Sequence, residues 1–364
     1  MKVNLRTFLQ KNGAWLGLFG LSFIFLILTH GEFGSARNLT NLLLQATING
    51  ILAAGMTLVI ITGGIDLSVG SVVAITGIAA GIAQLNWHFI DLGYTGAWLS
   101  VGVAVAAGLV CGAISGLLVA LLGVAPFVIS LGMMVIARGG ALILSGGATL
   151  SPMSDQLGKF SDSYVARVPS VLLVVAFMLC MIWVNRKQWQ SLVFPVLLLG
   201  AFAYAFYGYK GLPIFVIFLA AVAAIAGFWL NSTVFGRSIY AIGSNQRAAY
   251  WAGVRIRRTL FWVYTIMGAL SGLAGVLLCS RLNSADPNAG NLFELDAIAA
   301  VVIGGTSLRG GTGSVTGSLI GALIMAALNN GLDLLGISSF YQMVFKGCII
   351  IAAVALDSSQ RQKI

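Results

Sequence analysis

Asp66 is the residue whose chemistry differs most from that of its neighbours. It lies in the stretch Gly63-Gly64-Ile65-Asp66-Leu67-Ser68-Val69-Gly70-Ser71, between two long apolar runs, and no Lys or Arg occurs within ten residues of it. A carboxylate in an apolar setting is costly unless it is paired or hydrated. Because Gly63 and Gly64 permit a non-helical backbone, one interpretation is a helix break in which Asp66 and Ser68 line a polar path and Asp66 caps a helix beginning at Leu67. The alternative is a purely structural N-cap, since Asp-x-Ser before an apolar run is an ordinary helix start.

Arg138 and Asn329 are the other polar candidates. Arg138 lies inside the apolar run 126–146. Such an arginine usually faces a bundle interior or a watery cavity and seeks a carboxylate or carbonyl groups, although it can also extend to a membrane interface. Asn329, with Asn330, Tyr341 and Gln342, lies at the edge of the last apolar runs. These groups could bind hydroxyl groups of a passing solute, or they could be helix-end residues that face water.

A second glycine-rich segment resembles the one around Asp66. Residues 301–311 read Val-Val-Ile-Gly-Gly-Thr-Ser-Leu-Arg-Gly-Gly, so Gly304 and Gly305 follow an apolar run as Gly63 and Gly64 do. Internal repeats are common in transporters, in parallel or inverted sense. The similarity indicates either such a repeat, with a break in each copy, or independent use of glycine at two sites.

The basic stretch 236–258 has the composition of a docking segment. Ser244 or Asn245 can cap a short helix over residues 246–252, and Gly253 can end it. A short helix exposed between apolar runs is suited to binding in a groove of a partner. Two alanines would give this helix a smooth face and two aromatic residues would give it apolar anchors: Ala248, Ala249, Tyr250 and Trp251. The alternative is a basic connector without a partner.

The sequence lacks the usual signatures of nucleotide and metal chemistry. It contains no G-x-x-x-x-G-K-[ST] phosphate-binding loop, so ATP would have to be bound by a partner. His30 and His88 stand alone, and the four cysteines have no metal-ligand spacing. We therefore expect no catalytic residue, metal or cofactor in this chain.

The elements that position these residues must be membrane helices. Only 8% of the residues are charged and 59% are hydrophobic, whereas soluble domains have about 25% charged residues. A chain of 364 residues cannot hide so much apolar surface in one soluble core. The basic residues behind the net charge of +10 lie between apolar runs rather than in one stripe. This pattern excludes a nucleic-acid partner and indicates a protein surrounded by lipid.

Twelve apolar runs are candidate spans, so we expect an all-α, polytopic transmembrane bundle of about 10–12 spans. They cover residues 14–29, 41–62, 67–85, 97–123, 126–146, 169–184, 191–208, 213–231, 259–280, 295–307, 313–331 and 338–356. The run 295–307 is too short to cross a bilayer alone, which predicts a broken or re-entrant helix there.

Lysine and arginine predict the orientation of the bundle. If every run crosses and the N-terminus is cytoplasmic, the outer loops hold few basic residues, namely Arg37, Lys159, Arg167, Lys210 and Arg281. Arg138 and Lys346 fall inside spans, and the other basic residues, such as Lys2, Arg186, Lys187, Arg247 and Lys363, are on the inner side. We therefore expect both termini in the cytoplasm.

One transmembrane domain over residues 1–364 accounts for the whole chain, since no long polar stretch separates the runs. Residues 169–208, around Asn185-Arg186-Lys187-Gln188, resemble an inserted pair of helices in contact with lipid. Residues 232–258 form the cytoplasmic loop that carries the short helix.

Together, these segments resemble the bacterial sugar permeases of the ribose, xylose, galactose and arabinose importers, which are driven by ATP-binding cassette (ABC) ATPases. The resemblance covers nearly the whole chain and rests on residues 35–38, 63–71, 239–243, 245–253 and 294–308. The helix pair at 169–208 and the stretch 281–291 are most similar to the xylose permeases. Tyr250 and Trp251 depart from the family pattern, in which an Arg and a small apolar residue are usual, and this difference bears on the choice of ATPase.

The resemblance implies a type II ABC importer permease in the bacterial inner membrane. Two permease copies would pair, each bound to an ATPase subunit that holds ATP and magnesium. A periplasmic sugar-binding protein would deliver the monosaccharide, with a pentose such as D-xylose favoured, and would contact the outer stretches 147–168 and 281–294. The coupling helix at 245–253 would pass the motion of the ATPases to the spans through Gly243, Asn245, Arg247, Ala248, Ala249, Tyr250, Trp251 and Gly253.

The main alternative is an ion-coupled secondary sugar transporter, which needs no ATPase. Such carriers often use intramembrane acids as proton relays, but only Asp66, and Asp296 at the start of a short run, are candidates for one. A channel or a membrane enzyme lacks the ring of charge or the catalytic cluster it would need. Genes for an ATPase and a secreted binding protein beside this gene would favour the importer.

Overall fold

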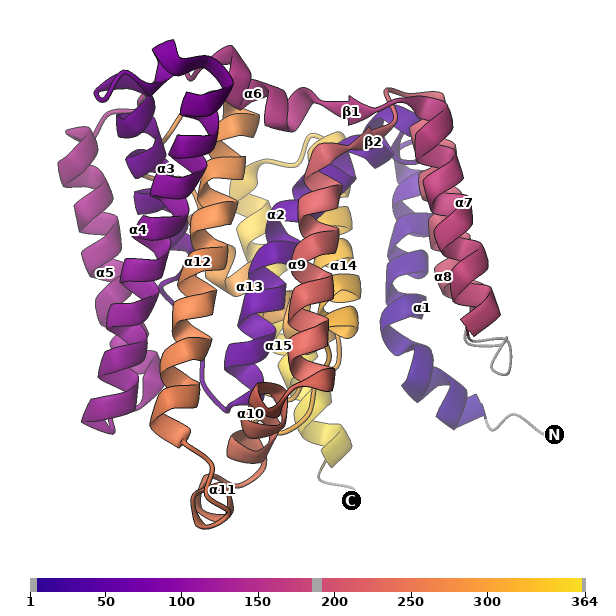
Figure 1. The fold of residues 1–364 in the computed structure, drawn as a ribbon. Coiled ribbons are helices and arrows are strands. Elements are labelled where there is room, and N and C mark those ends of the chain that lie inside the picture. The colour runs from indigo at the N-terminus through magenta and orange to yellow at the C-terminus, as the bar shows by residue number, and fades with distance from the viewer. Residues whose placement is uncertain (1–4, 185–191, 362–364) are drawn as a thin grey trace.

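The computed structural model describes residues 5–184 and 192–361, which are almost entirely helical (Figure 1). The long helices are α1 (Leu5–Leu28), α2 (Ala36–Ile61), α3 (Val69–Leu85), α4 (Gly93–Leu122), α5 (Pro126–Ser145), α7 (Arg167–Val184), α8 (Val193–Gly208), α9 (Ile214–Ser232), α12 (Ile256–Leu282), α13 (Phe293–Ile303), α14 (Val315–Leu334) and α15 (Ser339–Arg361). Short elements connect them: η1 (Glu32–Gly34), η2 (Phe89–Leu92), α6 (Asp155–Asp162), β1 (Tyr164–Val165), β2 (Leu212–Pro213), α10 (Val234–Ser244) and α11 (Gln246–Trp251). Lys2, Lys363 and the segment 185–188, which entered the sequence predictions, lie outside the described residues.

Each of the predicted apolar runs coincides with one of these long helices, which confirms the all-α, polytopic fold. Among the described residues, six helices are long and apolar enough to cross a membrane unaided. α13 has only 11 residues, or about 16 Å at a rise of 1.5 Å per residue, against a hydrocarbon core of about 30 Å. The run predicted to be broken or re-entrant is thus a half-length helix.

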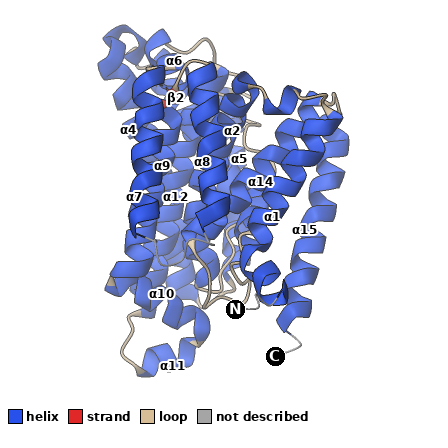
Figure 2. Cartoon of the chain, turned by 90° about the vertical axis from the view of Figure 1, so that its right-hand side faces the viewer, coloured by secondary structure: helices blue, strands red, loops and turns tan. Residues whose placement is uncertain are grey.

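The connections between helices gather at two ends of the bundle (Figures 1 and 2). α10 and α11 lie at the end that we call the inner end, where α1 begins and α15 ends. α6, β1 and β2 lie at the opposite, outer end. The two ends of the described chain therefore share one side of the bundle, as predicted, while the assignment of that side to the cytoplasm stays a prediction.

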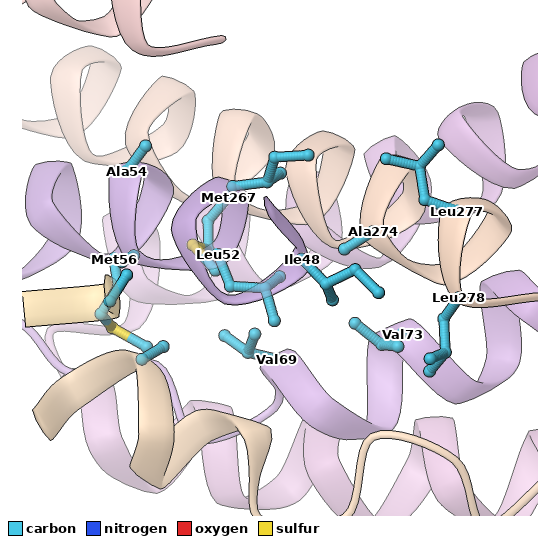
Figure 3. Packing of buried hydrophobic residues seen from close by; sticks show 14 of the residues in the cluster. Ile48, Leu52, Ala54, Met56, Val69, Val73, Met267, Ala274, Leu277 and Leu278 are labelled. Atoms are coloured by element: carbon cyan, nitrogen blue, oxygen red, sulfur yellow. The ribbon is translucent and has the colours of Figure 1, made fainter. Parts of the chain in front are cut away.

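α2 is the central helix of the bundle. It is buried over most of its length, because α8, α9, α12, α13 and α14 all pack against it. Figure 3 shows part of this core, which includes Ile48, Leu52, Val69, Val73 and Met267. A helix that is apolar all round requires neighbours on every side, and α2 has them. The α7–α8 pair lies at the edge of the bundle, with α8 against α2 (Figures 1 and 2).

α4 and α12 approach each other more closely than side chains would permit. A Cβ atom on Gly108 of α4 would lie 2.2 Å from the carbonyl oxygen of Gly268 of α12, and one on Gly112 would lie 2.9 Å from the Cα of Gly268. Small residues four positions apart let two membrane helices pack backbone to backbone. This pairing fixes α12, which in turn packs against α2 and α3.

Two helices begin inside the bundle rather than at an end. α3 begins at Val69, after the non-helical stretch 62–68, and runs outward until Gly81 lies against Ala285. α13 begins at Phe293, after the stretch 283–292, and runs inward to Gly304. The two helices therefore run in opposite directions from one interior region.

The first turns of these two helices are in contact. A Cβ atom on Gly70 of α3 would lie 2.1 Å from the carbonyl oxygen of Gly290, just before α13, and 2.4 Å from the Oε2 atom of Glu294 in its first turn. Glycine is required here because any side chain would collide with main-chain atoms. The interior region where α3 and α13 begin is where we look for a site.

Candidate functional site at two helix starts inside the bundle

Asp66, just before α3, is held by its own segment of chain. It is 4% exposed, and its Oδ1 accepts hydrogen bonds from the backbone N–H of Ser68 at 2.9 Å and from the Ser68 hydroxyl at 2.6 Å. The helix begins at Val69 with Ser68 in the N-cap position, so the prediction that Asp66 caps a helix beginning at Leu67 is wrong. Asp66 instead forms a turn with its own backbone, as Asp often does. The nearby positive end of the helix dipole favours its negative charge.

Tyr264 of α12 lies beside this turn. Its side chain is fully buried, and its hydroxyl has no hydrogen-bond partner among the described residues. A Cβ atom on Gly64 would lie 2.5 Å from that hydroxyl oxygen, so the glycine makes room for it. Asp66 is close enough to interact with Tyr264 electrostatically. The start of α3 thus contains a buried carboxylate and a buried hydroxyl, and none of the ion pairs in the described chain includes Asp66.

Asp296, in the first turn of α13, is held by two other helices. It is 2% exposed, and its Oδ2 accepts a hydrogen bond from the Nζ of Lys346 on α15 at 2.9 Å. The Nδ2 of Asn329 on α14 lies 3.5 Å from the same oxygen. The side chain of Lys346 is 18% exposed. Asn329 is therefore part of a buried charged group and does not face water at a helix end.

Arg138 of α5 is bound by main-chain carbonyl groups, as its position within a span predicts. Its Nη1 donates to the carbonyl oxygens of Pro287 at 2.6 Å and Ala289 at 3.0 Å, in the stretch that leads into α13. Glu294 and Asp286 also interact with it electrostatically. These contacts tie α5 to the start of α13 and rule out an arginine that simply extends to the membrane surface.

The two helix starts meet at Glu294, whose carboxylate packs against Gly70, since a Cβ atom on Gly70 would lie 2.4 Å from its Oε2 atom. Three carboxylates, those of Asp66, Glu294 and Asp296, thus lie at or just before a first helical turn, where the helix dipole favours negative charge. Transporters commonly build substrate sites from helices that begin inside the membrane. The arrangement offers donors and acceptors for binding a polar solute.

The two glycine-rich segments noted in the sequence also meet, at the inner end of the bundle. The backbone N–H of Gly311 donates to the carbonyl oxygen of Ile61 at 2.9 Å. A Cβ atom on Gly310 would lie 2.8 Å from the backbone nitrogen of Gly63. Gly243, the next-to-last residue of α10, completes this glycine contact, since its Cβ would lie 1.7 Å from the Ile61 oxygen and 2.5 Å from the Gly311 nitrogen.

Gly63 and Gly305 both adopt positive φ angles, of 81° and 90°, which glycine tolerates and most residues do not. Gly304 is at the inner end of α13, where a Cβ atom would lie 2.4 Å from the carbonyl carbon of Gly317. The residues predicted for a pathway therefore fall into two groups. Asp66, Ser68, Arg138 and Asn329 belong to the helix starts, with Gly64 beside Tyr264, while Gly63, Gly304 and Gly305 lie near the inner end.

α11 has the caps predicted for it. The Asn245 side chain, rather than that of Ser244, accepts a hydrogen bond from the backbone N–H of Ala248 at 3.0 Å. The helix ends at Trp251, and Gly253 follows with a φ of 79°. Just before it, the Tyr240 hydroxyl donates to the carbonyl oxygen of Gly313 at 2.8 Å. α10, which leads into α11, is thus attached directly to the segment that follows α13.

The exposed face of α11 differs from the predicted one. Trp251 is 84% exposed, and Tyr250, Arg247 and Ala248 are also exposed, but Ala249 is buried. The two alanines do not share an exposed face, because neighbouring residues on a helix are about 100° apart and one of them must turn toward the bundle. The exposed surface of α11 therefore consists of two aromatic rings, an arginine, a glutamine (Gln246) and one alanine.

Sequence reasoning did not select Asp296 and Lys346 as site residues. Both lie in apolar runs and carry opposite charges, and charges buried in membrane proteins usually pair with one another. That rule alone would have matched them. Tyr264 gave no comparable signal, because a tyrosine in an apolar run is ordinarily a packing residue, and Tyr240 lies in the basic stretch 236–258, where a tyrosine hydroxyl is not unusual.

Comparisons with known proteins agree with one another. The sequence matches the family described as branched-chain amino acid transport system / permease component over residues 38–354. The xylose transport system permease protein of Haemophilus influenzae is 38% identical, over 93% of this chain and 93% of its own length. The corresponding Escherichia coli protein is 37% identical, over 92% and 88%. The ribose import permease protein of Bacillus subtilis is 39% identical, over 96% and 93%. No solved structure matches the chain.

Proposed function

Because this chain belongs to the branched-chain amino acid transport system permease family and matches its xylose and ribose permeases over nearly their whole length, we propose that it is the membrane subunit of an ABC importer for a monosaccharide. The observation that carries the proposal is the buried polar site at the starts of α3 and α13, inside a chain that resembles sugar permeases throughout. In this proposal the protein lies in the bacterial inner membrane with both termini in the cytoplasm.

The translocation pathway in this proposal passes the two helix starts. Asp66, Ser68, Arg138 and Asn329 supply hydrogen-bonding groups in a bundle that is otherwise apolar. The non-helical stretches before α3 and α13 place backbone groups in the interior, which is tolerated where the backbone lines a cavity or is covered by protein. Gly63, Gly64, Gly304 and Gly305 are the positions where these stretches turn or pack closely.

The coupling to ATP hydrolysis in this proposal runs through α11 and the glycine contact. The exposed Arg247, Ala248, Tyr250 and Trp251 would bind a groove of the ATPase, while Ala249 faces the bundle. Gly243 touches the backbone of both glycine-rich segments, so a displacement of α10 and α11 must move those segments or separate from them. ATP and magnesium would be bound by the partner ATPase, and this chain would carry no catalytic residue.

A periplasmic binding protein would dock at the outer end. The two stretches predicted to receive it lie side by side, because Leu150 and Ala285 exchange backbone hydrogen bonds of 2.9 Å in both directions. One of these stretches leads into α13, which supports a route from the docking surface to the helix starts. We infer a pentose such as D-xylose as the sugar and a pair of permease chains in the complex, on the strength of the resemblance.

The test of this function is transport by a reconstituted complex. The permease, its partner ATPase and the binding protein are assembled in proteoliposomes, and uptake of labelled D-xylose, D-ribose and L-arabinose is measured with ATP, without ATP, and with a proton or sodium gradient. We expect uptake that requires ATP and the binding protein, with D-xylose preferred. Uptake by the permease alone in response to an ion gradient would instead identify a secondary transporter.

The docking surface has its own test within the same assay. Trp251→Ala and Ala248→Glu should reduce co-purification of the ATPase while leaving the permease correctly inserted. Ile143→Ala on α5 is a matched control, because Ile143 is also a large exposed apolar residue but is on a different helix. If the ATPase co-purifies equally with all these variants, α11 is not the docking helix.

A further inference from the structure

We propose that Asp296 and Asn329, together with Lys346, form a binding site for hydroxyl groups of the transported sugar. This inference rests on the proposed import function and names the residues that would contact the substrate. The three side chains come from three helices, α13, α14 and α15, and meet in the first turn of α13, where that helix begins inside the bundle.

Two acceptor atoms in this group of side chains lack donors among the described residues. Only Oδ2 of Asp296 is bonded to Lys346 and Asn329. The Oδ1 of Asp296 and the Oδ1 of Asn329 are both buried and have no hydrogen-bond partner among the described residues. Buried acceptors are nearly always paired, and one without a partner lowers stability. Two such atoms in one group of contacting side chains indicate that a donor molecule belongs there.

The charge of the group selects the kind of donor. Lys346 already neutralises Asp296 through an ion pair of 2.9 Å. A metal cation at the free oxygens would be repelled by the nearby ammonium group, so a cation site is disfavoured. Neutral hydroxyl groups can donate to both free oxygens, and a third hydroxyl can accept from the remaining protons of Lys346. A polyhydroxylated, uncharged solute therefore fits this group best.

Access to the group requires movement of α15. Both free oxygens are covered in this conformation, whereas the Lys346 side chain retains partial exposure at the edge. Among the side-chain hydrogen bonds of the described residues, only those from Lys346 and Asn329 link Asp296 to the neighbouring helices α15 and α14. A shift of α15 would uncover Asp296, and alternating-access carriers open and close their sites by such displacements.

The experiment compares D-xylose with its 2-deoxy, 3-deoxy and 4-deoxy analogues in the reconstituted complex. Asn329→Ala and Asn329→Leu remove the amide, and the double variant Asp296→Leu/Lys346→Met removes the ion pair without leaving a buried charge. We expect each variant to lower D-xylose uptake about 10-fold, the scale of a lost hydrogen bond in a buried site. For the analogue that lacks the recognised hydroxyl, the same variants should have no further effect. Each variant is compared with the parent for the same sugar. Any preference of the binding protein among the sugars therefore cancels in the ratio of variant uptake to parent uptake.

Asn330→Leu is the matched control. Asn330 is the next residue on α14, but its amide is already paired with Asn38 by bonds of 2.8 and 3.0 Å in both directions. Its replacement should change the uptake of all the sugars by one common factor. Elution profile and co-purified ATPase are measured for every variant, and the double variant decides the question if Asn329→Leu does not fold.

Two outcomes would overturn the inference, and they have different meanings. If the variants at Asn329, Asp296 and Lys346 change uptake of D-xylose and of every analogue by the same factor, the free oxygens are satisfied by water and the group is structural. If the unmodified complex imports none of the tested sugars with ATP, the proposed function itself fails.

Discussion

The start of α3 and the start of α13 each place a carboxylate in the interior, but they hold it in different ways. Asp66 is satisfied by Ser68, two residues away on the same segment. Asp296 is satisfied by Lys346 and Asn329, which belong to two other helices. The α3 start can therefore move as one unit without losing the bonds of its carboxylate, whereas any displacement of α13 against α15 must break an ion pair.

The α13 start is anchored to its neighbouring helices, whereas the α3 start is freer to shift. The α13 start is tied to α5 through Arg138, to α14 through Asn329 and to α15 through Lys346. The α3 start has one comparable link, from Ser130 on α5 to the carbonyl oxygen of Ile65 at 3.3 Å. Substitutions at the α13 start should therefore affect stability most strongly.

The largest effect is expected from Lys346→Met. It leaves Asp296 buried without a counter-ion, and breaking a buried pair from one side costs on the order of 3–5 kcal/mol. The free energy of unfolding in mixed detergent micelles measures the loss. The double variant Asp296→Leu/Lys346→Met should recover most of it. A double variant no more stable than Lys346→Met would show that the ion pair does not explain the loss.

A smaller effect is expected from Gly70→Ala, which acts on the contact between the two helix starts. The new methyl group would collide with the carbonyl oxygen of Gly290, and such overpacking costs about 1–3 kcal/mol. Gly227→Ala on α9 is the control, because a Cβ atom there meets nothing within 4 Å. Equal unfolding free energies for the two variants would mean that the starts of α3 and α13 are not in contact.

Ser68→Ala should cost less again, because the backbone N–H of residue 68 can still donate to Asp66. Loss of the hydroxyl donor alone, from a bond of 2.6 Å to a carboxylate, is worth about 1–2 kcal/mol. Ser115→Ala provides the comparison, since the buried Ser115 hydroxyl has no partner among the described residues. If both serine variants unfold at the same detergent concentration, Asp66 is not held by its own segment.

The smallest effect is expected from Lys210→Met, which breaks an exposed ion pair with Asp162 at the outer end. The bond that Lys210 donates to Asp162 raises the pKa of the Lys210 ammonium, so any stabilisation is present below the ordinary lysine pKa and disappears as pH rises through the raised value. Exposed pairs contribute little. We expect indistinguishable unfolding of variant and parent at pH 7 and at pH 11. A measurable loss of unfolding free energy at pH 7 would show that this exposed pair stabilises the protein, as we expect the buried Lys346–Asp296 pair to do.

The helical architecture could be predicted from the sequence, because apolar runs of span length report directly on membrane helices. The short run after Glu294 became α13, and Asn245 and Gly253 bound α11 as their residue types suggest. These predictions depend only on neighbours along the chain. The one-sided burial of Ala249 and the start of α3 at Val69 were missed, because both depend on packing against the bundle.

The composition of the site was predicted only in part. Arg138 and Asn329 stood out as polar residues in apolar runs, but their partners are set by the three-dimensional fold. The glycine contact joins Ile61 to Gly311, and Asp296 finds Lys346 on another helix. A single sequence contains no rule that pairs one glycine with another, whereas opposite charges in apolar runs do suggest their own pairing.

The contact of Gly243 with Ile61 and Gly311 has a consequence for how natural variants of this protein can differ. No side chain larger than that of glycine fits at position 243, because even a single Cβ atom would overlap the Ile61 oxygen. Selection can therefore retain or abolish this contact but cannot adjust it stepwise. In the proposed importer, substitutions that adjust how efficiently ATP hydrolysis drives transport should occur instead at exposed α11 positions such as Tyr250 and Trp251. Side chains of many sizes fit there.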